Sequence, residues 1–193
     1  MAGFNSKRFH QVLRFTDFFV KFFQVIMAIA IGAGLLVFLV LIFLPSSWFV
    51  FENLSSELTF VSANIAISDF DFSLSLKTLF MVSALLIAVY GVFGYYILHL
   101  IHHMIKKTRD HKPFDESVIK HMFRLGYTLM ISGVVIPIID FILVMIIGVA
   151  YQLNLTVEFN LQMNLILTGV LVYILANIFE YGAHLQSEVD LTV

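Results

Sequence analysis

The sequence has no cysteine and few charged residues. The absence of cysteine excludes a disulfide framework, a thiolate metal site and a cysteine nucleophile. Charged residues make up 12% of the chain and hydrophobic residues 60%, whereas soluble proteins have about 25% and about 45–50%. The chain is therefore too apolar for a soluble domain, and its 193 residues allow one domain of ordinary size.

The sequence patterns of common enzyme classes are also missing. No GxSxG, HExxH, Walker A or GxGxxG pattern occurs, and Gly32-Ala33-Gly34 lies inside an apolar run rather than after a strand. We therefore expect a non-enzymatic protein that has no catalytic residue and no cofactor.

In place of such motifs the sequence has long apolar runs. A helix needs about 20 apolar residues to cross the roughly 30 Å hydrocarbon core of a bilayer. We expect four transmembrane helices, over approximately residues 22–44, 79–101, 125–150 and 162–179. In the first of them Ala28/Gly32 and Ala30/Gly34 are spaced at i, i+4, which favours close helix packing. Because two of the runs are rich in small residues, a homodimer is also possible.

The basic residues are sorted along the chain. Of the 11 Lys and Arg residues, four precede the first run and six lie between the second and the third, and Lys77 is the only other one. Because cytoplasmic segments carry the excess of Lys and Arg, we expect a multi-pass protein of the cell membrane. Both termini, the loop 102–124 and the tail 180–193 would face the cytoplasm. That basic loop suits contact with anionic lipid head groups, and it is too short for us to expect direct nucleic-acid binding.

The two remaining connections have alternating apolar and polar residues. Alternation is found at Ile65 and Ile67, from Phe70 to Leu76, and again from Leu153 to Leu161. Strict alternation is typical of β-strands, and an open sheet edge cannot lie in lipid. We therefore expect an all-α membrane bundle of four transmembrane helices with a small extracellular antiparallel β layer, made from residues 46–76 and 151–162.

Asp140 is the one carboxylate in the third run, and it follows Pro137 by three residues near the centre of the run. A charge at that depth costs at least about 2.5–3.5 kcal/mol, so Asp140 should face the protein interior and have a polar partner or hold a proton. Pro137 removes a hydrogen bond to the carbonyl of Gly133, which favours a kink. Two interpretations of Asp140 stay open. It is either a protonatable or ion-binding residue in a transport or signalling path, or a structural carboxyl bonded to a neighbouring polar side chain (Thr168, Tyr173, Tyr90 or Ser83). Asn177 is a further polar residue of the fourth run.

Three histidines follow the second run. His99, His102 and His103 fall at i, i+3 and i+4 and so share a helix face. They could bind a transition metal or sense pH, but no Asp, Glu or Cys accompanies them in that turn. We therefore interpret them as amphipathic residues of the membrane interface and expect no metal site.

Two short motifs resemble those of a known family. Lys112-Pro113-Phe114-Asp115 opens the helix that leads into the third run, with Asp115 as its expected N-cap. The chain ends in Leu185-Gln186-Ser187-Glu188-Val189-Asp190-Leu191-Thr192-Val193. The sequence thus resembles a bacterial four-helix integral-membrane family catalogued as a domain of unknown function, whose members end in a similar run. It departs from the family at Phe179-Glu180-Tyr181-Gly182, where a basic residue is commoner, so its tail is more acidic.

Genes of this family often lie beside one for a small Cro-type helix-turn-helix regulator. The resemblance therefore implies that the protein holds or modulates a DNA-binding partner at the membrane. An apolar and acidic tail could dock on a basic DNA-binding module, and the alternative is that the tail is a solvated end. The candidate partner-binding residues are Leu185, Gln186, Glu188, Asp190 and Leu191.

These observations favour a non-enzymatic regulatory or sensory subunit that binds a cytoplasmic partner. The alternative is a small transporter or an immunity-type membrane protein that uses Asp140 inside the bundle. The two hypotheses predict opposite effects of deleting residues 185–193 and of the substitution Asp140→Asn.

Overall fold

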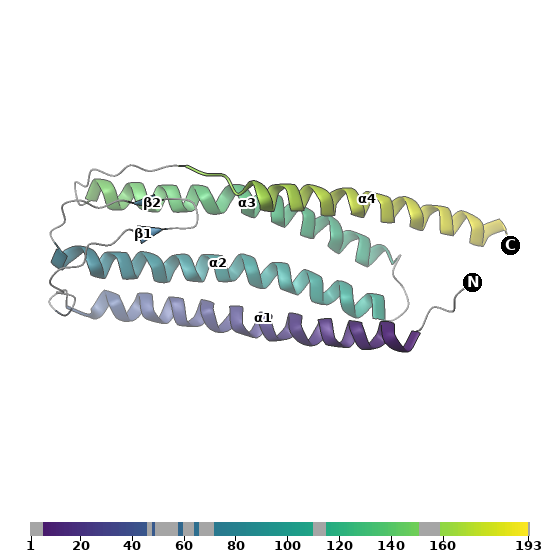
Figure 1. Ribbon diagram of the computed structural model, residues 1–193, viewed down its shortest axis with the longest axis horizontal. Helices are drawn as coiled ribbons and strands as arrows, with labels where there is room; N and C mark the ends of the chain where they lie inside the picture. The colour runs from purple at the N-terminus through teal and green to yellow at the C-terminus, as the bar shows by residue number, and fades with distance from the viewer. Residues whose placement is uncertain are drawn as a thin grey trace. The chain divides into compact units, whose positions relative to one another are not determined.

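Four long α-helices make up most of the structure, a computed structural model that describes residues 6–45, 48, 58–59, 64–65, 72–109, 115–150 and 159–192. In chain order they are α1 (Ser6–Phe43), α2 (Phe72–Arg109), α3 (Glu116–Ala150) and α4 (Met163–Thr192), as Figure 1 shows. The lipid interior offers no water to hydrogen-bond the backbone, and a helix satisfies its backbone groups within its own segment. The four apolar runs of the sequence accordingly lie in helices.

All four helices are long and apolar enough to cross a membrane. The segments that meet this criterion are Gln11–Phe43, Phe80–Thr108, Glu116–Ile146 and Met163–Glu188. By length and composition the chain is therefore a multi-pass membrane protein. Each helix also continues beyond the run predicted for it. In α4 the helix includes residues 180–192, for which a separate tail is predicted from the sequence.

The predicted extracellular β layer is wrong. Strand pairing among the described residues is limited to one two-residue antiparallel pair, in which β1 (Leu58–Thr59) faces β2 (Asn64–Ile65). The alternating residues from Phe72 to Leu76 form the start of α2, and residues 159–162 are neither helix nor strand. Trp48 is described as well and is not in a strand. The remaining residues of the two predicted β segments, 151–158 among them, lie outside the described ranges.

The physical reason for the error lies in the short alternating run at 72–76. Residues i and i+4 share a face in a helix as well as in a strand, so Phe72 and Leu76 fit both, and five residues are too few to distinguish the two periods. The long apolar run that follows is helical, and continuing that helix towards its N-terminus satisfies the backbone without a partner strand. Tertiary context overrides local strand propensity in this way.

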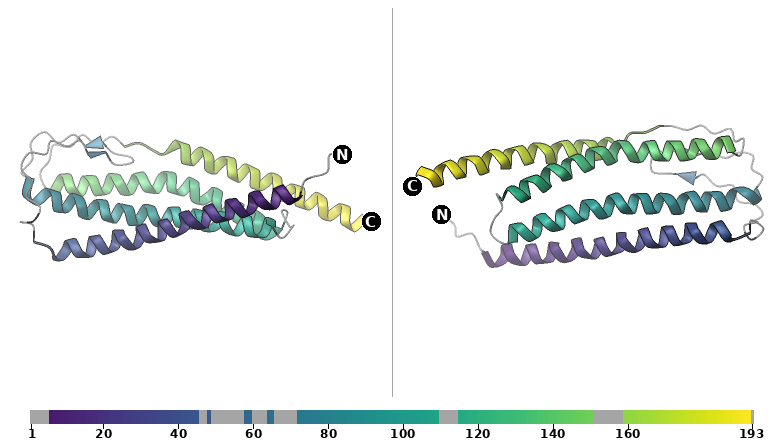
Figure 2. Two further views of the ribbon diagram at one scale, coloured as in Figure 1. Left: turned by 60° about the horizontal axis from the view of Figure 1, so that its bottom comes forward. Right: turned by 180° about the vertical axis from the view of Figure 1, so that it is seen from behind.

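The chain divides into two compact units. Unit 1 consists of Met1–Met27, Phe93–Ile131 and Leu165–Val193, and unit 2 of Ala28–Val92 and Ser132–Asn164. Unit 1 thus contains parts of all four helices. Unit 2 contains parts of α1, α2 and α3, and the segment before α4 with the first two residues of that helix. Within each unit α1 and α2 lie side by side (Figure 2).

A glycine on α1 and two alanines on α2 form the close contact between these helices in unit 2. A Cβ atom at Gly34 would lie 2.7 Å from the backbone oxygen of Ala84 and 3.2 Å from the backbone nitrogen of Ala88. Close helix packing is therefore confirmed for the predicted pair that contains Gly34. Gly32 has no such neighbour, because a Cβ atom there meets nothing within 4 Å.

Lys77 of α2 fixes the C-terminal end of α1 in unit 2. Its ammonium group donates to the carbonyl of Leu44 at 2.6 Å. The last carbonyls of a helix lack intrahelical donors and carry a partial negative charge, so a cation is favourable there. This contact gives the single basic residue outside the two basic segments a structural role.

A reciprocal glycine contact joins α3 and α4 in unit 1. A Cβ atom at Gly126 would lie 3.0 Å from the Gly169 oxygen, and one at Gly169 would lie 2.8 Å from the Gly126 oxygen. Beside this contact, Leu100, Leu125 and Leu129 form a buried apolar cluster, with Leu165 and Val172 of α4 packed against it. Small residues thus let the two backbones approach, as is common in membrane helices.

Asp115 caps the N-terminus of α3, as predicted. Its side-chain oxygen accepts a hydrogen bond from the Ser117 backbone N–H at 2.8 Å, and its carbonyl accepts one from the Val118 N–H at 2.9 Å. An N-cap side chain satisfies donors that have no partner within the helix. The rest of the Lys112-Pro113-Phe114-Asp115 motif lies outside the described residues.

Candidate functional site

The buried face of α3 in unit 2 carries a carboxyl group. Ser132, Ile136, Asp140 and Val144 recur every four residues, so they lie on one side of the helix, and all of them are buried. Asp140 is 0% exposed, and Pro137 beside it is also fully buried. The single carboxyl group of the third apolar run is therefore buried inside the protein.

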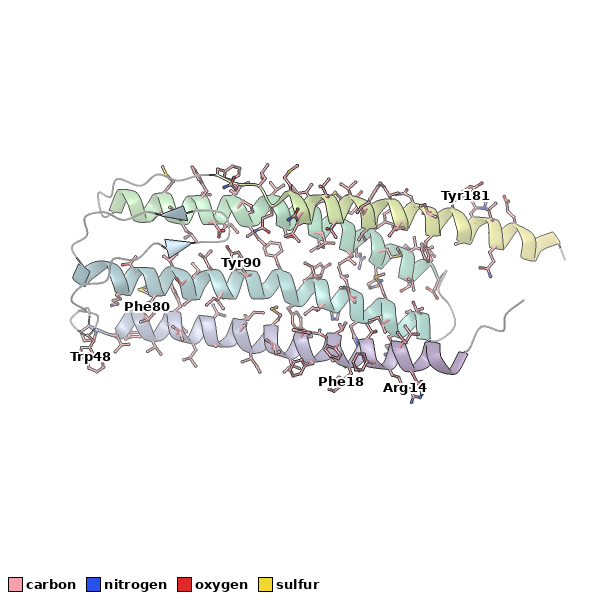
Figure 3. All side chains as sticks on the ribbon, viewed as in Figure 1. Arg14, Phe18, Trp48, Phe80, Tyr90 and Tyr181 are labelled. Carbon is pink, nitrogen blue, oxygen red and sulfur yellow. The ribbon has the colours of Figure 1, made fainter. Side chains whose placement is uncertain are left out.

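Tyr90 of α2 is a hydrogen-bond partner of Asp140. Its hydroxyl donates to Oδ1 of Asp140, and Figure 3 labels Tyr90 on α2. Of the four partners considered from the sequence, the structure thus brings Tyr90 to Asp140. Tyr173 instead contacts Phe123 and Tyr127 in unit 1, with ring centroids 5.2 Å apart in both cases.

One backbone carbonyl of α3 near Asp140 has no hydrogen-bond donor within the helix. Pro137 has no N–H, so the carbonyl of Gly133 lacks its i+4 donor. The backbone N–H of Gln162, in the segment before α4, donates to this carbonyl at 3.2 Å. In the same segment the ring of Phe159 makes an edge-to-face contact with Phe141 of α3, with centroids 5.7 Å apart.

The other two predicted intramembrane polar residues, Thr168 and Asn177, belong to α4. Both lie at exposed positions of α4 in unit 1. The amide of Asn177 donates to the carbonyl of Tyr173 at 2.8 Å, one turn earlier in the same helix. The predicted polar set therefore divides into a hydrogen-bonded pair, the buried Asp140 and the half-buried Tyr90, and two exposed residues of α4.

The three histidines of α2 have three different partners in unit 1. Nδ1 of His102 lies 2.7 Å from Oδ1 of Asp17 on α1, and Lys21 lies 3.1 Å from the other oxygen of that carboxylate. His103 stacks on His121 of α3 at 4.2 Å, and His99 stacks on Tyr95 at 6.4 Å. The described residues contain no cluster of three or more side chains suited to holding a metal ion.

Sequence reasoning missed Asp17. It is the only acidic residue before position 52, and Lys21 follows it by one helical turn, which is the signal that could have indicated a structural role. The side chain of Asp17 is 14% exposed and that of His102 is 23% exposed. The pair is therefore a largely shielded contact between α1 and α2.

The candidate partner-binding residues lie at the exposed C-terminal end of α4. Leu185, Gln186 and Glu188 are all exposed, and Asp190 and Leu191 fall in the last turns of the helix. Within residues 163–188 of α4, whose burial is described, the last buried residue is Ala176, which packs with Val118 and Met122 of α3. Tyr181, labelled in Figure 3, is 68% exposed.

A comparison with known families gives a match over most of the described helices. The family model described as a protein of unknown function, DUF2975, matches residues 74–193. The chain belongs to the DUF2975 family. The match begins in the first turn of α2 and includes all of α3 and α4. The hydrogen-bonded pair of Asp140 and Tyr90 and the exposed end of α4 are therefore both within the DUF2975 region, whereas α1 precedes it. Searches of curated proteins and of solved structures found no match.

Proposed function

We propose that the protein is a non-enzymatic regulatory or sensory subunit of the cell membrane that binds a cytoplasmic partner through the C-terminal end of α4. The partner class is a small basic DNA-binding regulator. The proposal places both termini in the cytoplasm, because ten of the 11 Lys and Arg residues lie before the first span or between the second and third.

The exposed end of α4 is the observation that carries this proposal. A helix of 30 residues is about 45 Å long, which exceeds the roughly 30 Å core of a bilayer. Residues 184–188 are exposed throughout, and in Figures 1 and 2 the last turns of α4 extend past the ends of the other helices of unit 1. A preformed helix in that position offers a binding surface without first having to fold.

The chemistry of this surface suits a basic partner. Ile178, Tyr181 and Leu185 are exposed at i, i+3 and i+7, which gives the helix one apolar stripe. Glu188 lies close by, 3.6 Å from Nδ1 of His184, and Glu180 and Asp190 add negative charge along the same end. An apolar stripe with acidic neighbours fits a groove on a basic protein, and DNA-binding modules are basic.

Site-specific photocrosslinking from position 185 tests the proposal in intact cells of the natural host. A photoreactive residue at Leu185 should capture a small protein that binds DNA when purified, and Glu188→Lys should reduce the capture several-fold. The matched control carries the photoreactive residue at Leu171, which is also exposed on α4 but lies in the apolar run. A protein captured equally from both positions, or none from Leu185, would contradict the proposal.

The same experiment separates the proposal from the alternative of a transporter or immunity-type protein. Asp140→Asn should leave capture from Leu185 unchanged, because unit 2 does not include the end of α4. The alternative is favoured if deletion of residues 185–193 has no effect on the host while Asp140→Asn has the effect of deleting the gene.

A further inference from the structure

The N-terminal half of α1 has an exposed aromatic face. Phe15, Phe18 and Phe22 follow one another at i, i+3 and i+7, and their exposed fractions are 65%, 67% and 54%. Residues at this spacing share one side of a helix. In Figure 3 the labelled Phe18 points away from α2, the neighbouring helix in unit 1. The three rings are therefore available to a partner outside the chain.

Two cations border this face. Arg14 is exposed, and the side chain of Lys21, seven residues later, is 57% exposed. Seven residues are nearly two full helical turns, so both cations lie along one flank of α1. Phe18 lies four residues after Arg14 and three before Lys21, and these are the spacings of neighbouring side chains on a helix. The exposed side of α1 thus combines positive charge with aromatic rings.

The positive charge of α1 is only partly balanced by acidic residues of the same helix. Residues 6–43 contain four Lys or Arg residues and one acidic residue, Asp17, which gives a net charge of +3 with histidine neutral. The two oxygens of Asp17 already contact Lys21 at 3.1 Å and His102 at 2.7 Å. The exposed side of α1 therefore attracts anions.

The length of α1 places these residues at a membrane surface. The helix has 38 residues and is about 57 Å long, which exceeds the roughly 30 Å hydrocarbon core by about 27 Å. Charged side chains are costly in the core, and no Lys, Arg, Asp or Glu occurs between Lys21 and the end of α1. The residues after Lys21 therefore cross the core, and the segment before them lies at the level of the lipid head groups.

We propose that the exposed side of α1 from Arg14 to Phe22 binds an anionic phospholipid. Arg14 and Lys21 attract the phosphate of the head group, and the rings of Phe15, Phe18 and Phe22 pack against the glycerol backbone and the upper part of the acyl chains. Basic residues beside apolar ones are the combination by which helices bind anionic lipid surfaces. The surface lies outside the part of the chain that matches DUF2975. This proposal is independent of the proposed function of α4.

Lipid titration of the full-length, delipidated protein in detergent tests this surface. Native mass spectrometry counts the bound molecules of phosphatidylglycerol, and phosphatidylcholine, which has no net charge, is the comparison lipid. The wild-type protein should bind phosphatidylglycerol several-fold more tightly, and Arg14→Gln should remove most of this preference. Phe18→Ala should weaken the binding of phosphatidylglycerol several-fold, because the lipid loses an aromatic contact.

Each variant has a matched control. Lys120→Gln removes an exposed cation of α3 that lies 2.6 Å from Glu116, and Phe43→Ala removes a ring that is 85% exposed at the other end of α1. Both controls should bind phosphatidylglycerol as the wild type does. Melting temperatures without added lipid check the fold, and those of Arg14→Gln and Phe18→Ala should match the wild type because both side chains are exposed.

Equal affinity of the wild type for the two lipids would overturn the proposal, and so would an unchanged preference in Arg14→Gln. An equal loss in Arg14→Gln and Lys120→Gln would also overturn it, because the preference would then follow the net charge of the protein and not this surface. If the wild type has no preference and a photoreactive residue at Phe18 captures a membrane protein in host cells, a protein and not a lipid covers this face.

Discussion

The backbone N–H of Gln162 donates to the carbonyl of Gly133, 29 positions earlier in the chain, at 3.2 Å. Gly133 is the residue whose intrahelical donor is removed by Pro137. The proline therefore leaves the Gly133 carbonyl free to accept a hydrogen bond from outside the helix. Through this bond the segment just before α4 is attached to the side of α3. A buried carbonyl without a donor would be costly, and the chain supplies the donor from a distant segment.

Pro137→Ala should loosen this attachment. Alanine restores an N–H at position 137 that competes with Gln162 for the Gly133 carbonyl. We expect amide hydrogen exchange in residues 159–163 to become faster, while exchange in α2 is unchanged. Val134→Ala, at an exposed position of α3, is the control. Unchanged exchange in residues 159–163 of Pro137→Ala would show that the contact with Gln162 does not depend on the proline.

Gly34→Leu should destabilise the protein by about 1–3 kcal/mol, the usual cost of overfilling a packed contact. The side chain would collide with the α2 backbone at Ala84 and Ala88. Gly32→Leu is a matched control two residues away, and it should have little effect because its Cβ meets open space. The stability of both variants is measured by thermal unfolding in detergent, in which the fraction of protein that remains monodisperse is followed. Equal losses for the two variants would contradict the packing described for α1 and α2.

Lys77→Met should lower stability by about 1 kcal/mol, because the Leu44 carbonyl loses a charged donor while the aliphatic part of the side chain is kept. Lys77→Arg should retain most of the stability, since a guanidinium group also donates to a carbonyl. The comparison uses the same thermal unfolding experiment. If Lys77→Met were as stable as Lys77→Arg, the cap at the end of α1 would not contribute to stability.

Asp17 and His102 should show coupling in a double-mutant cycle. Asp17→Asn, His102→Gln and the double variant are compared with wild type, which isolates the pairwise free energy. Because both side chains are mostly shielded, we expect a coupling free energy of about 0.5–1 kcal/mol at pH 6 and low salt, near the upper end for partly exposed pairs. His99→Gln in combination with Asp17→Asn is the control and should show additive effects.

Local features of the sequence predict the helices of this protein well, and they predict its long-range contacts poorly. Apolar runs long enough to cross a bilayer can adopt few structures, and the helix is the one expected for them. The residues of α1 to α4 are helical, as expected. The alternation at Phe72–Leu76 misleads, because five residues fit a strand or the first turn of a helix equally well. Asp115 is recognised as a cap because its partners, Ser117 and Val118, are its neighbours in sequence.

From the sequence, contacts between distant residues could be predicted only as one of several alternatives, or could not be predicted. Tyr90 was one of four partners considered for Asp140, and only the packing of α2 against α3 selects it. The bonds from Lys77 to Leu44 and from His102 to Asp17 join residues 33 and 85 positions apart. No local pattern encodes such pairings, because they depend on which faces of two helices meet.

The contact between Gly126 and Gly169 limits how α4 can move. At this level the two backbones touch, and the side chains of Met130 and Tyr173 stand beside the glycines. Sliding α4 by one turn, about 5.4 Å, would replace a glycine with a bulky side chain at the point of closest approach. The glycine contact therefore fixes the register of α4 against α3, and with it which residues form the exposed end of α4.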